Sequence, residues 1–403
     1  MTYGFFYVIS TLRTMTDVGL PVGDFTQDYL FARAAIDGTD PYQPLNLLAE
    51  RYMGSAERYS VPFATPHPPS LGLLFVPLTL LDPYVARNVW FIVEMSFLAL
   101  AVYFVMRTME LYPSVFVTAS VVAVLLCWYP VRRELELGQV MILLLLLLAS
   151  AHFALRRGHP YLSGFLLGLA IQIKFLAWPL LLLLALRREW HALMTAAATV
   201  LVSYGITAWV IGVEAIKNYF VHVLPEDGAL FRGEVDDISA WAIGWRIFQG
   251  TGQGVLSGIR EPALISSPLL ASLTSVAVPA LILLSAFLWL RTRRNLDAAI
   301  GVMICVSLLV SPSVGDHYLV LLIIPAGQVF GLLSRHGFPP RMTSLVLLAM
   351  TPMLFLFGGW AYLAPRLPFG TAWLAAIPAL GIGGLALMLA RLSSQMQPAL
   401  RST

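Results

Sequence analysis

Long apolar runs recur along this 403-residue chain, and they constrain its fold more than any other feature. A helix that crosses a bilayer needs about 20 apolar residues, because its backbone polar groups must be satisfied internally. Only 12% of the residues are charged, against about 25% in soluble domains. The pattern predicts an all-α polytopic membrane protein. It excludes a cytosolic globular enzyme, a disordered protein and a nucleic-acid-binding protein.

Twelve apolar runs are candidate transmembrane spans. They lie at 3–20, 84–106, 114–131, 138–155, 161–173, 175–187, 191–211, 265–290, 296–312, 318–333, 342–361 and 371–390. The fifth and sixth runs are each about 18–20 Å long as helices, which is short of a hydrocarbon core of about 30 Å. They form either a short hairpin with Gln172 and Lys174 near its apex, or one continuous long helix.

The distribution of charge along the chain predicts its orientation. Arginines gather in the short connections, and such residues favour the cytoplasmic side. The pairs at 156–157 and 187–188 are examples, whereas acidic residues concentrate in the longer connections 21–83 and 212–264. These two connections are therefore predicted to be extracytoplasmic, within one membrane-embedded domain over 1–403. The first contains an amphipathic stretch, 28–37, which predicts a helix on the membrane surface that ends at Gly38.

Two aspartates open the first long connection, in the sequence Gly23-Asp24-Phe25-Thr26-Gln27-Asp28. Asp24 and Asp28 are four residues apart, one helical turn. A carboxylate at the membrane interface is suited to act as a general base towards a lipid-borne hydroxyl. The alternative is that Asp24 caps the helix that follows and Asp28 is solvated.

Two further polar motifs face the same predicted side. In Thr65-Pro-His-Pro-Pro-Ser70, prolines flank His67 and fix its backbone, so the imidazole lies either in a substrate pocket or on an exposed rigid turn. Pro130-Val-Arg-Arg-Glu-Leu-Glu-Leu-Gly-Gln139 brings Arg132 and Arg133 next to Gln139. The two arginines either bind a phosphate or form ion pairs within an interfacial loop.

Lys174 is the most informative charged residue, because it falls between two short apolar segments. An ammonium inside the membrane needs an anionic partner, and a lipid phosphate is the natural candidate. The alternative is a lysine that extends its amine to the interface. Asp316 and His317 follow the ninth run and are predicted to face the same side, where they can meet Asp24.

No cofactor requirement is predicted. Cys127 and Cys305 lie inside apolar runs, with no zinc-ligand spacing, and no glycine-rich nucleotide fingerprint occurs. Whether the outside acids hold a divalent metal ion stays open, since no ligand spacing demands one.

The order of these motifs resembles glycosyltransferase family 87, the polyprenol-phosphate-mannose-dependent α-1,2-mannosyltransferase group of the GT-C class, over nearly the whole chain. The matching residues are Gly23-Asp24-Phe25, Gly38-Thr-Asp-Pro-Tyr42, His67-Pro-Pro69, Gly138-Gln139, Gly164, Gly168, Lys174, Ser311-Pro-Ser313 and His317-Tyr318. The resemblance implies a GT-C fold of about twelve transmembrane helices, with surface helices in the first extracytoplasmic loop. It also implies a bacterial plasma-membrane location, a polyprenyl-phosphate sugar donor and a lipid or glycan acceptor.

The resemblance also implies site residues. Asp24 takes the position of the catalytic aspartate, with Asp28 in reserve, and His317 that of the histidine after the Ser-Pro motif. Lys174 matches the lysine of the glycine-rich segment and, helped by Arg132 and Arg133, is expected to hold the donor phosphate. His67, Gln139, Asp316 and Tyr318 are expected to line the substrate pocket.

The expected activity is therefore inverting transfer of mannose on the extracytoplasmic face. The sequence departs from the family at His67, where an aromatic residue is common, and at Val314-Gly315, where many members have tryptophan. The rival prediction is a lipid or lipid-linked sugar flippase that uses Glu94, Gln139, Gln172 and Lys174 as a polar path.

Overall fold

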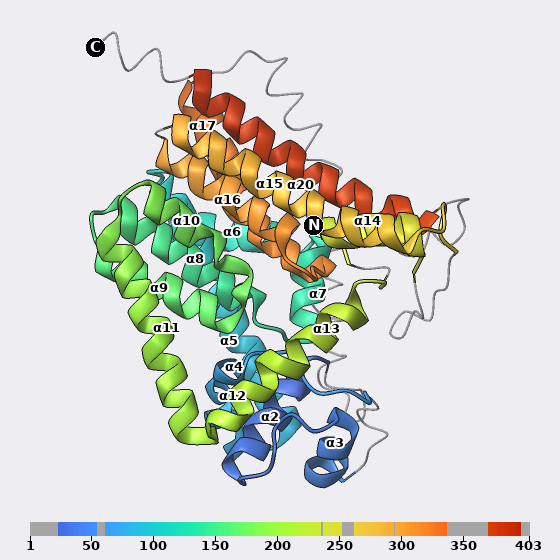
Figure 1. The fold of residues 1–403 in the computed structure, drawn as a ribbon. Coiled ribbons are helices and arrows are strands. Elements are labelled where there is room, and N and C mark those ends of the chain that lie inside the picture. The colour runs from blue at the N-terminus through green and yellow to red at the C-terminus, as the bar shows by residue number, and fades with distance from the viewer. Residues whose placement is uncertain are drawn as a thin grey trace.

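The computed structural model describes residues 23–54, 61–234, 237–251, 262–293, 295–336 and 370–395. All regular elements within these ranges are helical (Figure 1). In chain order they are α2 (Phe25–Ile36), α3 (Leu45–Met53), α4 (Pro69–Leu74), η2 (Val76–Leu80), α5 (Pro83–Thr108), α6 (Val115–Leu125), α7 (Tyr129–Leu137), α8 (Met141–Arg156), α9 (Pro160–Ile173), η3 (Phe175–Ala177), α10 (Pro179–Leu186), α11 (Trp190–Ile211), α12 (Val213–Asn218), η4 (Tyr219–Val223), α13 (Leu224–Phe231), α14 (Ala240–Gln249), α15 (Pro268–Thr292), α16 (Leu296–Val310), η5 (Asp316–Leu322), α17 (Ile323–His336) and α20 (Gly370–Gln395).

Three of the described helices, α5, α11 and α15, are long and apolar enough to cross a membrane. Helices α6 and α7 qualify only as a pair, bent by 85° at their junction. Other apolar helices, such as α8, α9 and α16, have 10–17 residues. The predicted runs 3–20 and 342–361 lie outside the described residues. The prediction of a helical protein with several apolar helices is confirmed, whereas the count of twelve spans stays a prediction.

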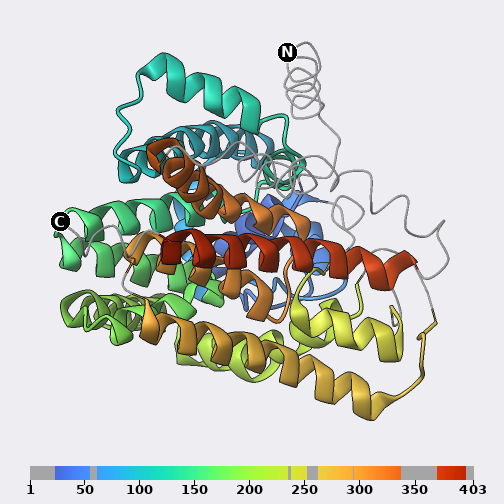
Figure 2. The same ribbon diagram turned by 90° about the horizontal axis from the view of Figure 1, so that it is seen from above.

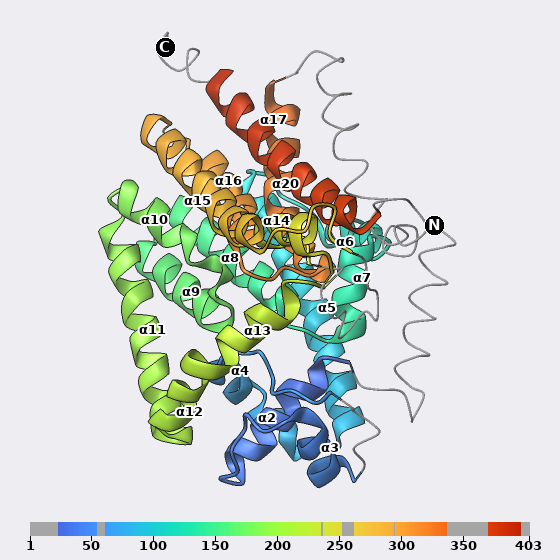
Figure 3. The same ribbon diagram turned by 45° about the vertical axis from the view of Figure 1, so that its right-hand side comes forward.

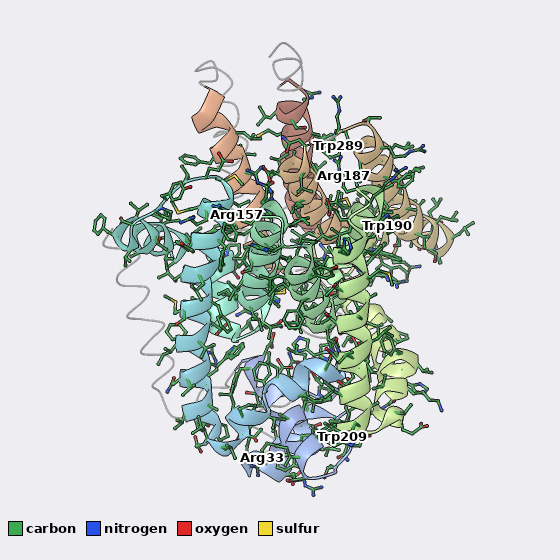
Figure 4. The ribbon with its side chains drawn as sticks, turned by 90° about the vertical axis from the view of Figure 1, so that its left-hand side faces the viewer. Arg33, Arg157, Arg187, Trp190, Trp209 and Trp289 are labelled. Carbon is green, nitrogen blue, oxygen red and sulfur yellow. The ribbon has the colours of Figure 1, made fainter. Side chains whose placement is uncertain are left out.

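Helix α11 has the features of a lipid-facing span. Its side chains are largely exposed, and Trp190 and Trp209 lie near its two ends with exposed fractions of 54% and 86%. At 1.5 Å per residue the two positions are about 28 Å apart, which matches the hydrocarbon thickness, and tryptophan favours membrane interfaces. Figure 4 shows Trp190 at the end that carries Arg157 and Arg187, and Trp209 at the opposite end with Arg33.

Helix α9 packs very closely against α11 through two glycines one turn apart. A Cβ at Gly164 would lie 2.2 Å from the carbonyl oxygen of Ala192, and a Cβ at Gly168 would lie 2.7 Å from that of Ala196. Small residues four positions apart form a flat helix face that lets two backbones approach. The position of α9 is therefore set by backbone contact along its length.

The chain breaks directly after α9. Lys174 has an extended backbone conformation, with φ −146° and ψ 128°, and the 3₁₀ turn η3 and Pro179 follow before α10 begins. Proline suits the first turn of a helix, where its missing N–H has no partner to lose. The prediction of two short segments is confirmed, and the alternative of one continuous helix is wrong.

The first long connection folds into the protein. The predicted helix at 28–37 is present as α2, and Gly38 with φ +66° follows its end. However, nine of the twelve residues of α2 are buried, including Asp28. Burial of both faces of this helix was not predicted, and its place on the membrane surface stays a prediction. Tertiary packing covers most of its side chains, and Figure 3 shows α2, α3, α4 and α12 together at one end of the molecule.

The second half of the chain packs around α16. Every residue of α16 from Ala298 to Val310 is buried, and the helix contacts α10, α15, α17 and α20 (Figure 2). The segment before α14 is fastened to the end of α16, because Ile238 donates a backbone hydrogen bond to Val314 at 2.9 Å and Asp237 Oδ1 accepts from Val314 N at 3.1 Å. These contacts hold the segment before α14 against the loop that follows α16.

Candidate active site

Asp24 is positioned by a close contact between the start of α2 and the end of α7. Gly23 has φ +63°, and a Cβ there would lie 2.6 Å from the carbonyl oxygen of Leu137, so only glycine allows this approach. Asp24 occupies the N-cap position of α2, but its side chain makes no capping hydrogen bond. Instead, its Oδ2 accepts from Nε2 of Gln139 at 2.6 Å. The alternative in which this carboxylate caps the helix is wrong.

The turn that carries Gln139 is held by two side chains of α5. Arg87 donates to the carbonyl oxygens of Leu135 and Glu136 at the end of α7. Trp90 Nε1 donates to the carbonyl oxygen of Gly138 at 3.0 Å. These bonds satisfy carbonyls that every helix end leaves without an intrahelical partner. Helix α5 thereby fixes the turn from which the Gln139 side chain projects.

Lys174 meets Gln139 from the broken end of α9. Its Nζ donates to Oε1 of Gln139 at 3.2 Å and to the hydroxyl of Tyr318 at 2.5 Å, and 8% of the residue is exposed. Ser70 fastens this end of α9 by donating to the carbonyl oxygen of Gln172 at 3.1 Å. Among the residues that the structure describes, no carboxylate lies within 4.0 Å of the ammonium. Hydrogen bonds thus link Asp24, Gln139, Lys174 and Tyr318 in one chain.

Asp316 and His317 lie beside this chain, next to Tyr318. Nδ1 of His317 is 3.6 Å from Oδ1 of Asp316, and Nε2 of His317 is buried without a hydrogen-bond partner. Burial raises the pKa of Asp316, but hydrogen bonding to His317 and the charges of His317 and Arg133 outweigh it, so the pKa is lowered. The sequence predicts that this pair lies near Asp24. The charge of Arg133 acts on both Asp316 and Asp24, which supports that prediction.

Asp28 and His67 form a second, separate pair. Oδ1 of Asp28 is 2.7 Å from Nδ1 of His67, and the two residues are 0% and 4% exposed. Oδ2 of Asp28 has no hydrogen-bond partner, which is costly for a buried carboxylate oxygen. Tyr42 holds the histidine loop by donating to the carbonyl oxygen of His67 at 3.0 Å. The alternatives of a solvated Asp28 and an exposed His67 are wrong.

Arg132 and Arg133 are engaged with a neighbouring carboxylate. Both lie 3.8 Å from the carboxylate of Glu136, and Arg132 also stacks over the ring of Tyr129 at 5.3 Å. This is the arrangement expected for an interfacial ion-pair cluster. Their predicted contact with a phosphate is not tested by these contacts and stays a prediction.

Two carboxyl groups near Lys174 were not singled out from the sequence. Glu134 is fully buried, and its Oε1 accepts from the backbone N–H groups of Met141 and Ile142 at the start of α8. Asp227 projects from α13. Burial raises the pKa of Asp227 to about 7, although the charge of Lys174 lowers it. The charges of both groups act on Lys174 from beyond ion-pair distance.

The sequence signals for these two groups were weak. Glu134 alternates with Glu136 in Glu-Leu-Glu, and the pattern does not tell which carboxylate points inward. Asp227 follows Glu226 in a connection rich in acids, where nothing distinguishes it. Within the described ranges, no group of three or more His, Cys, Asp and Glu side chains is arranged to hold a metal ion. Metal dependence stays open.

Comparisons with known proteins converge on one family. The family model described as Glycosyltransferase family 87 matches residues 65–312, more than half of the chain. This range contains His67, Gln139 and Lys174, whereas Asp24 and His317 lie outside it. No solved structure matches the chain.

Two curated proteins of Mycolicibacterium smegmatis (strain ATCC 700084 / mc(2)155) are similar to this chain. A polyprenol-phosphate-mannose-dependent alpha-(1-2)-phosphatidylinositol mannoside mannosyltransferase is 27% identical over 150 residues, which cover 34% of each protein. A polyprenol-phosphate-mannose-dependent alpha-(1-2)-phosphatidylinositol pentamannoside mannosyltransferase is 29% identical over 196 residues, 49% of this chain and 45% of the relative. The chain therefore aligns with a third to just under half of the length of these relatives.

Proposed function

The chain belongs to glycosyltransferase family 87, and from that membership we propose that it transfers a mannosyl group from a polyprenyl-phosphate donor to a hydroxyl of a glycolipid or glycan. The donor and the sugar follow from the names of the two relatives. The observation that carries the proposal is the environment of Lys174, a buried ammonium whose hydrogen bonds within the described part of the chain go to neutral groups. Such a cation is poised to receive an anion.

The donor phosphate is the anion that Lys174 would bind. A buried charge without a close counter-ion is costly, and a phosphodiester carries a permanent negative charge. Gln139 and Tyr318 hold the ammonium in place through the two hydrogen bonds described above. Arg132 and Arg133 are reserve contacts for the same phosphate, because they lie in the helix that ends at the Gln139 turn.

Asp24 would act as the general base. Its Oδ2 accepts from Gln139, which leaves Oδ1 for the acceptor hydroxyl. The hydroxyl oxygen attacks the anomeric carbon from the face opposite the phosphate, and its proton passes to Asp24. The bond between the anomeric carbon and the phosphate oxygen breaks, and the electron pair leaves with the polyprenyl phosphate, whose charge Lys174 stabilises. This attack inverts the configuration at the anomeric carbon.

The remaining polar groups would line the substrate pocket. The partner-free Nε2 of His317 and Oδ2 of Asp28 are buried hydrogen-bonding atoms that sugar hydroxyls can satisfy. We place His317 at the reacting sugar, because it precedes Tyr318, the hydrogen-bond partner of Lys174. Asp28 is the reserve base, acting through the His67 imidazole that it holds.

The reaction would take place on the extracytoplasmic side of a bacterial plasma membrane. Arg157 and Arg187 lie at one end of the molecule, and Arg33 of α2 lies at the other (Figure 4). Arginine-rich short loops favour the cytoplasm, so the end with α2 faces outward. We propose a GT-C fold of about twelve spans as the complete arrangement. No observation favours the flippase alternative, and Glu94, a residue of its proposed path, lies 3.7 Å from Arg87.

Reconstitution tests this proposal directly. Purified protein in lipid vesicles would be incubated with polyprenyl-phosphate [radiolabelled mannose] and phosphatidylinositol mannoside, and the lipid products separated by chromatography. We expect radiolabel in a larger glycolipid, and none with the Asp24→Asn variant. Movement of the labelled donor between leaflets without any new glycolipid would instead establish a flippase.

A further inference from the structure

A cavity lies away from the hydrogen-bonded chain of the active site. It is an open hollow of about 520 Å³ between the C-terminal end of α2 and the helix α12, which Figure 3 shows side by side. Polar groups line it, among them Asp40, Asn218, Lys217 and His222. Its volume falls within the range of about 300–1,000 Å³ that is usual for small-molecule sites.

The cavity adjoins the end of α11 that carries Trp209. Val210 and Ile211 form part of its wall, and the preceding residue is Trp209, 86% exposed at the outer end of α11. An exposed tryptophan at the end of a span marks the membrane–water interface. An occupant of this cavity would therefore lie at the level of lipid head groups, beside the outer end of α11.

The lining selects a neutral, hydroxylated ligand. Lys217 is 3.5 Å from Glu214, so its charge is already paired, and Asp40 adds a further negative charge. Asp40 Oδ1 accepts from the backbone N–H of Tyr42 at 2.9 Å, which fixes the carboxylate. Asn218 provides an amide donor and an amide acceptor, and the ring of His222 adds two nitrogen atoms that can form hydrogen bonds. Since these groups carry no surplus positive charge, the cavity fits sugar hydroxyls better than a phosphate.

Two tyrosines connect this cavity with the Asp28–His67 pair. The segment η4 is a short turn of π-helix, a form found frequently at functional sites. It buries Tyr219, which stacks on Tyr42 at 5.8 Å, while His222 lines the cavity. Tyr42 in turn holds the His67 loop. Asp24 and Gly38 lie at opposite ends of α2, about 20 Å apart. The cavity, which Gly38 lines, is therefore remote from the hydroxyl that would react at Asp24.

We propose that this cavity binds a sugar of the acceptor glycolipid that does not react, and so anchors the acceptor while its distant hydroxyl is presented to Asp24. The inference rests on the proposed function, because that function defines the acceptor. Binding energy from remote parts of a substrate can be used to position its reacting part. The cavity would therefore distinguish an extended glycolipid from a small acceptor that cannot reach it.

The test compares two acceptors in variants of the cavity wall. Ala215→Trp fills the cavity, and Asn218→Leu removes an amide at similar size. Ala229→Trp, on the exposed face of α13, is the matched control. With phosphatidylinositol mannoside as acceptor, we expect both cavity variants to raise the apparent KM about tenfold. With octyl α-mannoside, which is too small to span both sites, we expect rates like those of the unmodified protein.

Several results would overturn the inference. Equal losses with both acceptors would show a general structural effect, and unchanged kinetics with both would show that the cavity is not used. If the unmodified protein transfers to neither acceptor, equilibrium binding of labelled phosphatidylinositol mannoside in nanodiscs decides. Binding weakened about tenfold by Ala215→Trp would keep the cavity assignment while the proposed function fails. Binding that is absent, or equal in both proteins, would overturn the cavity assignment.

Discussion

Gln139 donates a hydrogen bond from Nε2 to Oδ2 of Asp24 at 2.6 Å, although 115 positions separate the two residues. Through Oε1 the same amide accepts from Lys174. An amide has one donating and one accepting end, so only this orientation serves a carboxylate on one side and an ammonium on the other. Gln139 therefore joins the proposed base to the proposed phosphate-binding group.

The first prediction concerns the base. Asp24→Asn keeps the shape of the side chain but removes the proton acceptor, and we expect turnover to fall by about 10²–10⁴-fold. Thermal unfolding in detergent should change little. Asp28→Asn is the companion variant. If it abolishes turnover while Asp24→Asn stays active, the base is the Asp28–His67 pair; if both stay active, general-base catalysis by this helix is wrong.

The second prediction concerns the phosphate contact. Lys174→Met removes the charge at similar length, and we expect the donor KM to rise by about 10–100-fold, corresponding to the loss of a charge-assisted contact. Turnover should also fall if the contact strengthens as the phosphate leaves. Lys174→Arg should restore part of the activity. Normal donor kinetics in a less stable Lys174→Met protein would instead assign Lys174 a purely structural role.

The third prediction concerns pH. Burial raises the pKa of Asp227 to about 7, so this group is mostly protonated below pH 7 and ionised above it. Ionised Asp227 offsets the charge of Lys174 and weakens phosphate binding, whereas the phosphodiester keeps its charge throughout. We expect the donor KM to rise several-fold between about pH 6 and 8. Asp227→Asn should reduce this rise but not abolish it, because burial also raises the pKa of Glu134 to about 7 and its charge acts on Lys174 over the same pH range. The exposed neighbour of Asp227, Glu226, is the control, and a rise reduced equally in Glu226→Gln would refute the assignment.

The fourth prediction concerns orientation. In a Cys127→Ser background, a cysteine at Gly228 of α13 should react with a membrane-impermeant thiol reagent on intact cells. A cysteine at His159, exposed in the turn after α8, should react only after lysis. Cys305 is buried and should not react with the reagent. Labelling of both engineered positions from outside would overturn the proposed orientation.

Much of the helical framework could be predicted, because apolar length depends only on local sequence. The break at Lys174 was also readable, since Lys174 and Pro179 interrupt two runs that are each too short to span the bilayer. The burial of α2 was not predicted, for a physical reason. An amphipathic pattern shows that one face is apolar, but burial of the polar face of α2 depends on α3, α4 and α5, which contact it in the fold.

The candidate site was predictable only as a set of residue types on one side of the membrane. Asp24, Gln139, Lys174 and Tyr318 are joined by hydrogen bonds, while their roles in the reaction stay predictions. The pairing of Asp28 with His67 was not foreseen, since proline-fixed loops do not reveal where they dock. Asp227 was missed for the same reason. Its place near Lys174 depends on how α13 packs in the fold, which no local pattern encodes.

The contact between α9 and α11 also determines where Lys174 lies. Gly164 precedes Lys174 by ten residues, about 15 Å of helix, yet the backbone of α11 leaves no room for even a methyl group there. An alanine at this position would push α9 aside and carry the ammonium out of register with Gln139 and Tyr318. A random-mutagenesis screen for inactive variants would therefore also recover substitutions that lie far from any substrate. In a rate measurement alone, such a protein would be indistinguishable from one that lacks its phosphate-binding cation.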